Sequence, residues 1–386
     1  MKPARHIAMK YDWPAPEERF ASRLQSLTKK SLYRRLQAPK GLDVSSNDYL
    51  GLARDDRISK AMVSSLTAGL DVGSTGSRLL TGERRDLEAV ECRFAQWQQQ
   101  EAALYFASGY QANLGLMSSV IEAGDHVISD ALNHASLIDG IRLSKARLSI
   151  IDHLDSHQME QALRSNEGPH WIVTESLYSM DGDLAPIESY ARLAKKYGAG
   201  LLVDEAHATG LYGPQGQGRV AALRLQKDVV ATVHTCGKAM GLAGAFVTGS
   251  KNLRSLLVNQ ARSFIYSTGP LPVLAPALEA SIEAICNDPA RRQQPIQMAK
   301  RLRDRLIEGG LEVGGGGAIV PVILGSSSRA MAIAEALQHR GYDVRAIRPP
   351  TVPEGTARLR LVTGGHLKHT DIDRLASDIL DILESL

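Results

Sequence analysis

The sequence predicts an α/β protein with a large, doubly wound and mostly parallel sheet, followed by a smaller α+β domain at the C-terminus. Between residues 46 and 280, short runs of consecutive apolar residues alternate with amphipathic stretches. Such runs are typical of parallel strands that helices cover on both faces. Beyond this region the pattern changes, and a chain of 386 residues is long enough to form one large and one smaller unit.

The predicted strands of the large domain are short runs of mainly apolar residues. They comprise Ala102–Ala107, His126–Ser129, Trp171–Thr174, Gly200–Val203, Val229–Val233 and Gly244–Thr248. A helix is predicted over Leu184–Tyr197, because Gly198 follows it and tolerates the positive φ that often ends a helix. Strands that alternate with helices in this way favour a doubly wound sheet.

The smaller domain begins after a segment rich in proline. Three prolines between residues 270 and 276 mark a turn and a helix start, and a long helical region then runs toward Gly309. The elements expected beyond it are strands at Ile319–Leu324 and Ala357–Val362 and helices at Ser328–Arg340 and Thr370–Leu383. Thr370 and Asp373 form a capping-box pattern at the start of the last helix. We therefore predict an N-terminal arm (1–45), a large domain (46–280) and a small domain (281–386).

Composition and charge argue against several classes of protein. The net charge of +3 is too small to indicate nucleic acid or a membrane surface as the partner. The three cysteines lie far apart without a CxxC pair, so we expect neither a disulfide framework nor a bound metal. Residues 1–16 lack the apolar core of a signal peptide, and no apolar run approaches the length of a membrane span. A cytoplasmic protein is expected.

A polar segment follows one of the predicted strands. Asp204 comes directly after Gly200–Val203, and His207 lies in the turn beyond it. Ligands of open α/β sheets bind beyond the carboxyl ends of the strands. A carboxylate at this position can keep a pyridine nitrogen protonated, which turns the ring into an electron sink. His207 can donate a hydrogen bond to a phenolic oxygen of such a ring.

The segment Asp204–His207 reads Asp-Glu-Ala-His, and this string also allows other interpretations. In helicase-type ATPases such a string binds Mg²⁺, but this requires an upstream phosphate loop ending in Gly-Lys-Ser or Gly-Lys-Thr. The only Gly-Lys pair, Gly237-Lys238, is followed by Ala239, which argues against an ATPase. A purely structural role for Asp204 as a helix N-cap stays open when the segment is taken alone.

Lys238 lies in the segment Thr235–Gly241, after the apolar run Val229–Val233. A lone lysine is usually a solvated surface residue. Here Gly237 and Gly241 let the backbone and a ligand approach closely. An apolar setting would lower the pKa of Lys238 and suit it to Schiff-base formation and proton transfer, while Thr235 could contact a cofactor phosphate. Lys238 and Asp204 in this order and spacing indicate a pyridoxal-phosphate site.

Two further junctions between strands and helices complete the candidate site. At Phe106–Asn113, the free backbone N–H groups of Gly109 and Tyr110 could bind a phosphate, although an ordinary turn is the simpler interpretation of this segment alone. His134 follows the strand at His126–Ser129. It is either an unremarkable core or surface histidine, or a group that stacks on the pyridine ring beside the reacting carbon.

These segments together resemble the α-oxoamine synthases, which are pyridoxal-phosphate enzymes of fold type I. The resemblance runs in family order over roughly nine-tenths of the chain. The matching segments are Ser45–Leu52, Gly73–Gly82, Ser108–Asn113, Asn133–Leu137, Glu175–Gly182, Asp204–His207, Thr235–Lys238 and Ile265–Thr268.

The resemblance implies a role for each matching residue. In the catalytic set, Lys238 carries the cofactor as a Schiff base, Asp204 pairs with the pyridine nitrogen, His207 reaches the phenolic oxygen and His134 stacks on the ring. Ser179 also reaches the phenolic oxygen. The cofactor phosphate is bound by Gly109, Tyr110 and Thr235, and by Thr268 of the partner subunit in a homodimer with shared active sites. On the substrate side, Arg360 binds the amino-acid carboxylate as a fork of paired donors, Arg34 and Thr351 contact the acyl substrate, and Asn47 lines the site.

The stretch Ala346–Arg360 is similar to one branch of this family. That branch condenses L-alanine with a pimeloyl thioester in biotin biosynthesis, with release of CO₂ and of the thiol carrier. The thioester could be carried by coenzyme A or by acyl carrier protein, and the sequence leaves both open. Another acyltransferase of the family, such as one that joins glycine and an acetyl group, is the alternative.

Overall fold

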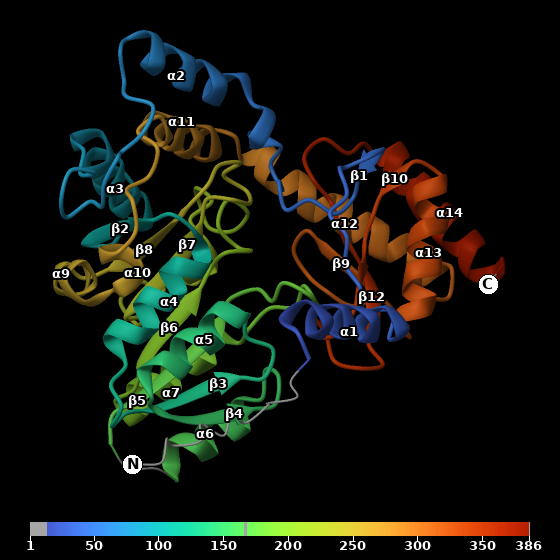
Figure 1. The fold of residues 1–386 in the computed structure, drawn as a ribbon, viewed down its shortest axis with the longest axis horizontal. Coiled ribbons are helices and arrows are strands. Elements are labelled where there is room, and N and C mark those ends of the chain that lie inside the picture. Colours follow the sequence, from blue (N-terminus) through green and yellow to red (C-terminus); the bar gives the residue numbers. More distant parts are fainter. Residues whose placement is uncertain (1–13, 166–167, 386) are drawn as a thin grey trace, which may run out of the picture.

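The computed structural model describes residues 14–165 and 168–385. The expectation that the chain lacks a signal peptide rests mainly on residues 1–13, which lie outside the described residues. Figure 1 shows two lobes. A large sheet with its helices forms one lobe, the C-terminal residues form the other, and the long helix α12 (Pro289–Glu308) runs from the first into the second.

The large lobe is built on a sheet of seven strands in the order β2-β8-β7-β6-β5-β3-β4. Only β8 runs antiparallel to its neighbours, and the remaining pairs are parallel. The mostly parallel sheet is therefore confirmed. The strands are β2 (Ala102–Phe106), β3 (His126–Asp130), β4 (Arg147–Ile151), β5 (His170–Glu175), β6 (Gly200–Asp204), β7 (Ala231–Thr235) and β8 (Ala245–Gly249).

The edge strand β4 was not predicted from the sequence. Most of its side chains are exposed or only partly buried, and Ile151 is the one that is fully buried. Its sequence therefore lacks the continuous apolar run that marks the strands of the sheet interior. Pairing with β3 along its whole length stabilises it instead.

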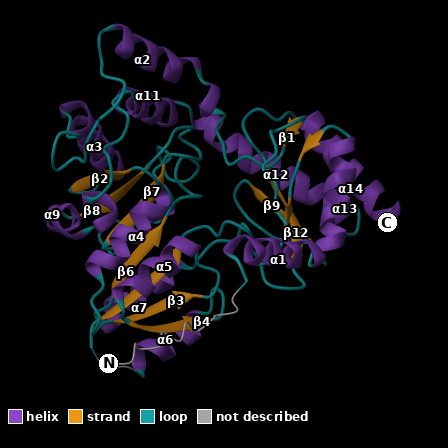
Figure 2. Cartoon of the chain, viewed as in Figure 1, coloured by secondary structure: helices purple, strands orange, loops and turns teal. Residues whose placement is uncertain are grey.

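Helices cover both faces of this sheet, as Figures 1 and 2 show. Successive residues of a strand point to opposite faces, so Val173 packs among residues of α4, α5 and α9 on one face, whereas Ile172 packs among residues of α6 and α7 on the other. The helices are α3 (Arg85–Gln98), α4 (Gly109–Val120), α5 (Ala135–Ser144), α6 (Ser156–Arg164), α7 (Ile187–Tyr197), α8 (Arg219–Ala222), α9 (Lys251–Gln260) and α10 (Arg262–Ile265).

Two helix predictions need correction. Helix α7 begins at Ile187 rather than Leu184, because the backbone of Leu184 forms a bridge with Leu177; its end at Gly198, with φ of 65°, is as predicted. The helical region before Gly309 consists of two helices, α11 (Leu274–Asn287) and α12. They separate at Asp288, whose side chain accepts a hydrogen bond from the Arg291 N–H and so caps α12,.

The small lobe contains a three-stranded antiparallel sheet in the order β11-β12-β9. Its elements are β9 (Ile319–Gly325), α13 (Ser327–His339), β10 (Tyr342–Asp343), β11 (Ala346–Ile347), β12 (Ala357–Val362) and α14 (His369–Ser385). The predicted capping box is wrong. Helix α14 begins one residue before Thr370, the Asp371 carboxylate accepts the Lys368 N–H, and Asp373 pairs with Arg301 at 2.6 Å.

The N-terminal segment reaches both lobes. Helix α1 (Pro16–Lys29) has no buried residue, and the strand β1 (Leu42–Asp43) pairs in parallel with β10 of the small lobe. The short helix η1 (Leu52–Arg54) then leads to α2 (Asp56–Thr67), which packs against α11 at the top of Figure 1. The segment from β1 to α2 therefore links the small lobe to the helices of the large lobe. The domain boundaries themselves stay a prediction.

Gly244, in the turn between β7 and β8, allows a comparison with Gly69. Both have positive φ, 86° and 91°, so alanine strains both by about 1 kcal/mol. A Cβ at Gly244 would lie 1.9 Å from the Tyr105 hydroxyl, whereas nothing lies within 4 Å of one at Gly69. We expect Gly244→Ala to lower the unfolding free energy by about 2 kcal/mol more than Gly69→Ala, measured by urea denaturation. Equal losses would contradict the packing at this turn.

Candidate active site

The candidate site lies where the parallel strands of the large sheet end. Asp204 closes β6, Glu175 closes β5 and Thr235 closes β7. Glu175 and Asp204 are direct partners in the register of β5 and β6. Because parallel strands point their carboxyl ends to one edge of the sheet, residues far apart in the sequence meet there.

Asp204 is buried and its carboxylate is held by two hydrogen bonds. The Asn113 side chain donates to Oδ2 at 2.7 Å and the Ala206 N–H donates to Oδ1 at 2.8 Å. Asn113 lies on α4 and also donates to the Ser136 hydroxyl of α5 at 2.9 Å. The residues that follow Asp204 form a turn, and the next helix, α8, begins only at Arg219, so Asp204 is not a helix N-cap.

Lys238 lies in the loop (236–244) between β7 and β8. Its Nζ is 2.6 Å from Nε2 of His207. Burial lowers the pKa of Lys238 to about 8, against the opposing negative charges of Asp204 and Glu175,. A neutral amine is therefore accessible near physiological pH, as the sequence led us to expect.

His207 is fixed from its other side by a tyrosine. The Tyr49 hydroxyl lies 2.6 Å from Nδ1. Burial, and then the positive charges of Lys238 and Arg360, hold the pKa of His207 well below its usual value. The ring is thus neutral, with one donor and one acceptor nitrogen, and can meet both Tyr49 and Lys238.

The predicted phosphate site lies at the N-terminus of α4. The Ser108 hydroxyl accepts the Gln111 N–H at 3.2 Å and caps the helix, so the N–H groups of Gly109 and Tyr110 remain without helical partners. A Cβ at Gly109 would lie 2.4 Å from Cγ2 of Thr235. The two residues therefore border the same narrow space, which only glycine leaves open.

His134 caps helix α5 at the same edge of the sheet. Its backbone N–H donates to Oε1 of Glu175 at 2.7 Å, and its Nδ1 lies 2.7 Å from the Ser136 hydroxyl. Burial lowers the pKa of His134, although the charge of Asp204 opposes this effect. The imidazole is therefore neutral at physiological pH.

Strand β12 brings an arginine from the small lobe to this edge. Arg360 is buried, donates through Nε to the Ser179 carbonyl and donates through Nη2 to Oδ1 of Asn47 at 2.9 Å. The structure thus brings together three of the predicted residues. Nη1 of Arg360 makes no hydrogen bond with any described residue, which leaves a donor for a ligand.

The remaining predicted residues lie apart from this group. Arg34 donates through Nη2 to the Thr351 hydroxyl at 2.9 Å, so the two predicted acyl-substrate residues contact each other. Thr268 is exposed and its backbone forms a bridge with Ser77. Thr268 makes no side-chain hydrogen bond to any of the other predicted residues across the described ranges.

Sequence reasoning missed several residues that shape the site. Asn113 and Glu175 occurred within the matching segments but received no role, although both stand at strand or helix ends that the sequence predicts. Tyr49 also lies in a matching segment, Ser45–Leu52, but no predicted strand or helix end marks it, and only the folded chain brings it to His207. His153 follows β4, a strand that was not predicted.

His153 links two loops beside the site. Its Nδ1 lies 2.8 Å from Asp130 at the end of β3, and its Nε2 lies 2.8 Å from Asp183 in the loop between β5 and α7. That loop carries Ser179, and its Asp181 pairs with Arg358 of β12. Burial alone would lower the pKa of His153, but the two carboxylates outweigh it and raise the pKa to about 10.

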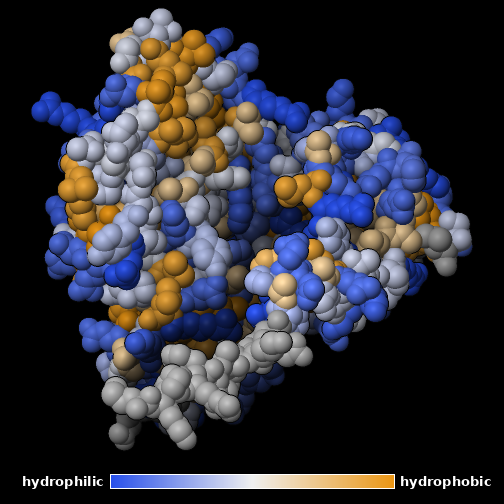
Figure 3. Space-filling view, in the orientation of Figure 1, coloured by the Kyte–Doolittle hydropathy of each residue, from blue (hydrophilic) through white to orange (hydrophobic). Residues whose placement is uncertain are grey.

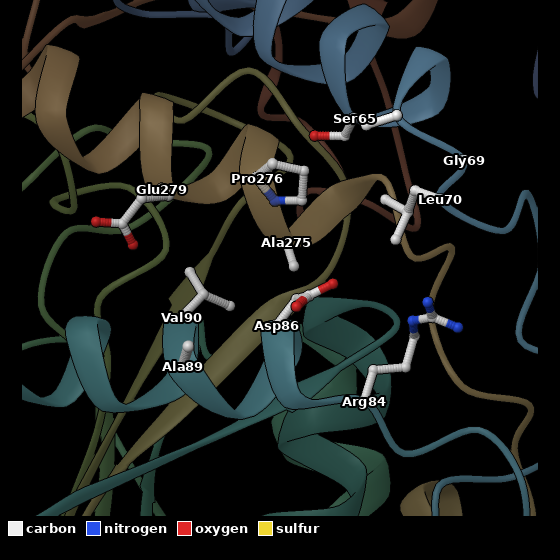
Figure 4. A pocket seen from close by; sticks show the side chains of 11 residues that line it. Ser65, Gly69, Leu70, Arg84, Asp86, Ala89, Val90, Ala275, Pro276 and Glu279 are labelled. Atoms are coloured by element: carbon white, nitrogen blue, oxygen red, sulfur yellow. The ribbon is translucent and has the colours of Figure 1, made fainter.

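A separate pocket of about 650 Å³ lies between α2, α3 and α11 (Figure 4). It is lined by side chains such as Leu70, Arg84 and Glu279, and none of the predicted site residues reaches it. Among residues 14–165 and 168–385, no cluster of histidine, cysteine and carboxylate side chains is arranged to hold a metal ion. No helix in these ranges has the length and apolarity needed to cross a membrane.

The residues at the strand ends fit pyridoxal phosphate. A buried carboxylate at Asp204 suits a protonated ring nitrogen, a buried amine of lowered pKa at Lys238 suits covalent attachment of the cofactor, and the space between Gly109 and Thr235 suits a phosphate at a helix N-terminus,. Fold and site together define a pyridoxal-phosphate enzyme of fold type I.

Comparisons with known proteins agree with this class. Residues 39–379 match the family model described as aminotransferase class I and II. An SPT structure with PLP superimposes with a TM-score of 0.88 at 26% identity, over 95% of this chain and 98% of that one. The 8-amino-7-oxononanoate synthase of Anaeromyxobacter dehalogenans is 41% identical over 89% of this chain and 87% of its own. That of Lysinibacillus sphaericus is 39% identical over 95% and 98%.

The chain belongs to the class I and II aminotransferases and, within them, to the 8-amino-7-oxononanoate synthase family. The fold class and the pyridoxal-phosphate cofactor expected from the sequence are thereby confirmed.

The His153 contacts predict a pH dependence of stability. Because the pKa of His153 is raised from 6.5 to about 10, its contribution is fully present below pH 6.5, declines above it and is lost as the pH rises through about 10. We expect His153→Gln to lower the unfolding free energy by about 2 kcal/mol at pH 6, and the difference from wild type to narrow by pH 10.

Chemical denaturation at pH 6, 8 and 10 measures this difference. His157→Gln, at an exposed position of α6, is the matched control and should show no such trend. A deficit for His153→Gln that is the same at pH 6 and pH 10 would rule out a charged His153.

Proposed function

We propose that this protein condenses L-alanine with a pimeloyl thioester, releasing CO₂ and the free thiol carrier and forming 8-amino-7-oxononanoate for biotin biosynthesis. The observation that carries the proposal is the buried amine of Lys238, 2.6 Å from a neutral His207 and beside Asp204 and Glu175. Membership of the family and the position of Arg360 support the choice of substrate.

Lys238 is proposed to move the Cα proton of the amino acid. Bound pyridoxal phosphate supplies an electron sink that stabilises negative charge at Cα. With a pKa of about 8, the Lys238 amine is close to the pH at which a base and its conjugate acid are both available, which suits a group that accepts a proton and later returns it. His207, 2.6 Å away, orients the amine.

Asp204 is proposed to keep the ring nitrogen protonated. Burial, and then the negative charge of Asp204, raise the pKa of Glu175 well above its usual value. Burial and this repulsion therefore favour the protonated form of Glu175,. The Asp204 carboxylate, fixed by Asn113, is placed to stabilise a cation.

Two groups are proposed to act on the substrates directly. Arg360 has an unused Nη1 donor and is held by Asn47 and the Ser179 carbonyl, which suits the planar carboxylate of an amino acid. His134 is neutral and anchored through its backbone to Glu175, so it can donate a hydrogen bond to the oxygen of the thioester as negative charge develops there. Arg34 and Thr351 contact the acyl chain, and Ser179 contacts the phenolic oxygen.

We also propose a homodimer in which Thr268 serves the site of the partner subunit. The loops that carry Ser77 and Thr268 are joined by a backbone bridge and by the Gly269 N–H, which donates to the Gly76 carbonyl at 2.8 Å. Large apolar side chains on and beside these loops are exposed, which is unusual for a monomer. They are Val72, Leu79, Leu80, Tyr266 and Leu271.

The choice of substrate is tested by a panel of amino acids and thioesters. We expect faster release of CO₂ and thiol from L-alanine with pimeloyl-CoA than from glycine with acetyl-CoA or from L-serine with palmitoyl-CoA. Lys238→Ala should lower the rate by at least about 10³-fold. Borohydride reduction of the wild type should label the peptide that contains Lys238. Faster turnover of either rival pair would refute the proposed substrates.

The dimer is tested by placing a charge in the exposed apolar patch. Leu80 is 81% exposed in the single chain. If the dimer buries it, changing it to aspartate should weaken the association by about 1–3 kcal/mol per subunit. Leu80→Asp is therefore expected to shift the protein toward monomer in sedimentation equilibrium and to make activity fall on dilution. Ile307→Asp, on α12, is the control and should behave like wild type. A dimer of unchanged affinity would place the interface elsewhere.

A further inference from the structure

Tyr49 lies where the two lobes meet, in the segment between β1 and η1. Its side chain is fully buried. Its backbone carbonyl accepts the Gly365 N–H of the small lobe at 2.8 Å, whereas its hydroxyl lies 2.6 Å from Nδ1 of His207 in the large lobe. Figure 3 shows a hollow with mainly hydrophilic walls between the lobes. Tyr49 is thus a buried link at this junction, and its hydroxyl is the part that reaches the candidate active site.

The Tyr49 hydroxyl belongs to a chain of hydrogen bonds that crosses the site. At one end, Nζ of Lys238 is 2.6 Å from Nε2 of His207, whose Nδ1 faces Tyr49. At the other end, the Tyr49 hydroxyl is 3.2 Å from Oδ1 of Asn47, and that oxygen is 2.9 Å from Nη2 of Arg360. The chain therefore joins the amine proposed to move the Cα proton to the guanidinium proposed to bind the carboxylate.

The direction of the hydrogen bonds at the Arg360 end follows from chemistry. A guanidinium group has N–H donors and no acceptor, so the Asn47 atom that faces Arg360 is the amide oxygen. An amide oxygen cannot donate, so the proton between Tyr49 and Asn47 belongs to the Tyr49 hydroxyl. Burial raises the pKa of Tyr49, although the charge of Arg360 opposes this effect. The hydroxyl therefore keeps its proton at physiological pH.

The Lys238 end gives the same direction. With a pKa of about 8, Lys238 is mainly an ammonium group at pH 7, and an ammonium group can only donate. Nε2 of His207 is then the acceptor. Because burial holds the pKa of His207 well below its usual value, the ring carries a single proton, which must be on Nδ1. Nδ1 therefore donates to the oxygen of Tyr49, whose own proton points to Asn47.

We propose that Tyr49 is a positioning residue that fixes the tautomer of His207 and, through it, holds the proton on Lys238. A hydroxyl suits this place because it accepts from His207 and donates to Asn47 at the same time. The inference rests on the proposed function, which assigns the Cα proton to Lys238 and the substrate carboxylate to Arg360. One hydroxyl then keeps the base and the carboxylate site in a single network.

The first test is the position of the proton on His207. Apoenzyme and holoenzyme are labelled with ¹⁵N in the histidine rings, and nuclear magnetic resonance at pH 7 distinguishes a protonated Nδ1 from a protonated Nε2. The signals of His207 are identified by their loss in His207→Asn. We expect Nδ1 to carry the proton in both forms, because the Arg360 end sets the direction in both. A proton on Nε2 alone would contradict the inference.

The second test measures the effect of the hydroxyl on Lys238. Tyr49→Phe removes the acceptor of the Nδ1–H that an ammonium group at Lys238 requires, so the charged form becomes less stable. We expect the pKa of Lys238 to fall by about one pH unit. Competitive labelling of the apoenzyme with acetic anhydride between pH 6 and 10 measures this pKa through the mass of the peptide that contains Lys238. An unchanged pKa would overturn the inference.

Tyr190→Phe is the matched control. Tyr190 of α7 is also fully buried, but its hydroxyl has no hydrogen-bond partner among the described residues. Its loss should leave the pKa of Lys238 unchanged. Neither substitution alters the charged and titratable groups that face Lys238 and His207, which are Asp204, Glu175, His134 and Arg360.

Asn47→Ala provides a second variant if Tyr49→Phe does not fold. Without the Asn47 oxygen, the Tyr49 hydroxyl can turn its proton toward Nδ1 of His207, which favours the other tautomer. We expect the pKa of Lys238 to fall in this variant too, by less than in Tyr49→Phe. A purely structural Tyr49 predicts a lower unfolding free energy with no change at Lys238 in either variant, and that result would refute a positioning role.

Failure of the proposed function would look different. The tautomer of His207 and the pKa of Lys238 are measured without substrate, so both results would stand while the substrate panel showed another amino acid or thioester being used. An unchanged pKa of Lys238 in Tyr49→Phe, together with a panel that favours L-alanine and pimeloyl-CoA, would leave the function in place and remove this inference alone.

Discussion

The site depends on how the large sheet fixes one buried carboxylate. Asp204 ends β6 with both oxygens engaged, by Asn113 from α4 and by the Ala206 backbone, while its strand neighbour Glu175 is pushed toward its neutral form. The negative charge of Asp204 partly offsets the burial that lowers the pKa of Lys238 to about 8. The chemistry proposed for Lys238 therefore depends on the carboxylate at the end of β6.

The second constraint joins the two lobes. The loop between β5 and α7 is held from the large lobe by His153 through Asp183. The same loop is held from the small lobe by Arg358 and Arg360, which bind Asp181 and the Ser179 carbonyl. This loop therefore positions the arginine that faces the site.

The interior of the fold was predictable and its edges were not. Strands such as β5 and β6 are buried on both faces, so their continuous apolar runs mark them in the sequence. Strand β4 lies at an edge, and the boundary between α11 and α12 depends on one cap at Asp288, so neither has a strong local pattern. The capping box predicted at Thr370 does not form, because Asp373 pairs with Arg301 of α12 instead.

The sequence by itself determined the class of the protein. The order of four residues after predicted strands indicates pyridoxal phosphate: His134, Asp204, His207 and Lys238. A residue near the carboxyl end of a parallel strand can be placed from the sequence, because these ends meet at one edge of the sheet. Only the tertiary structure decided which groups surround them: Tyr49 against His207, Glu175 beside Asp204, and Arg34 against Thr351, 317 residues away. The pKa values that make the site reactive depend on burial and on charges brought from other elements, and these exist only once the chain has folded.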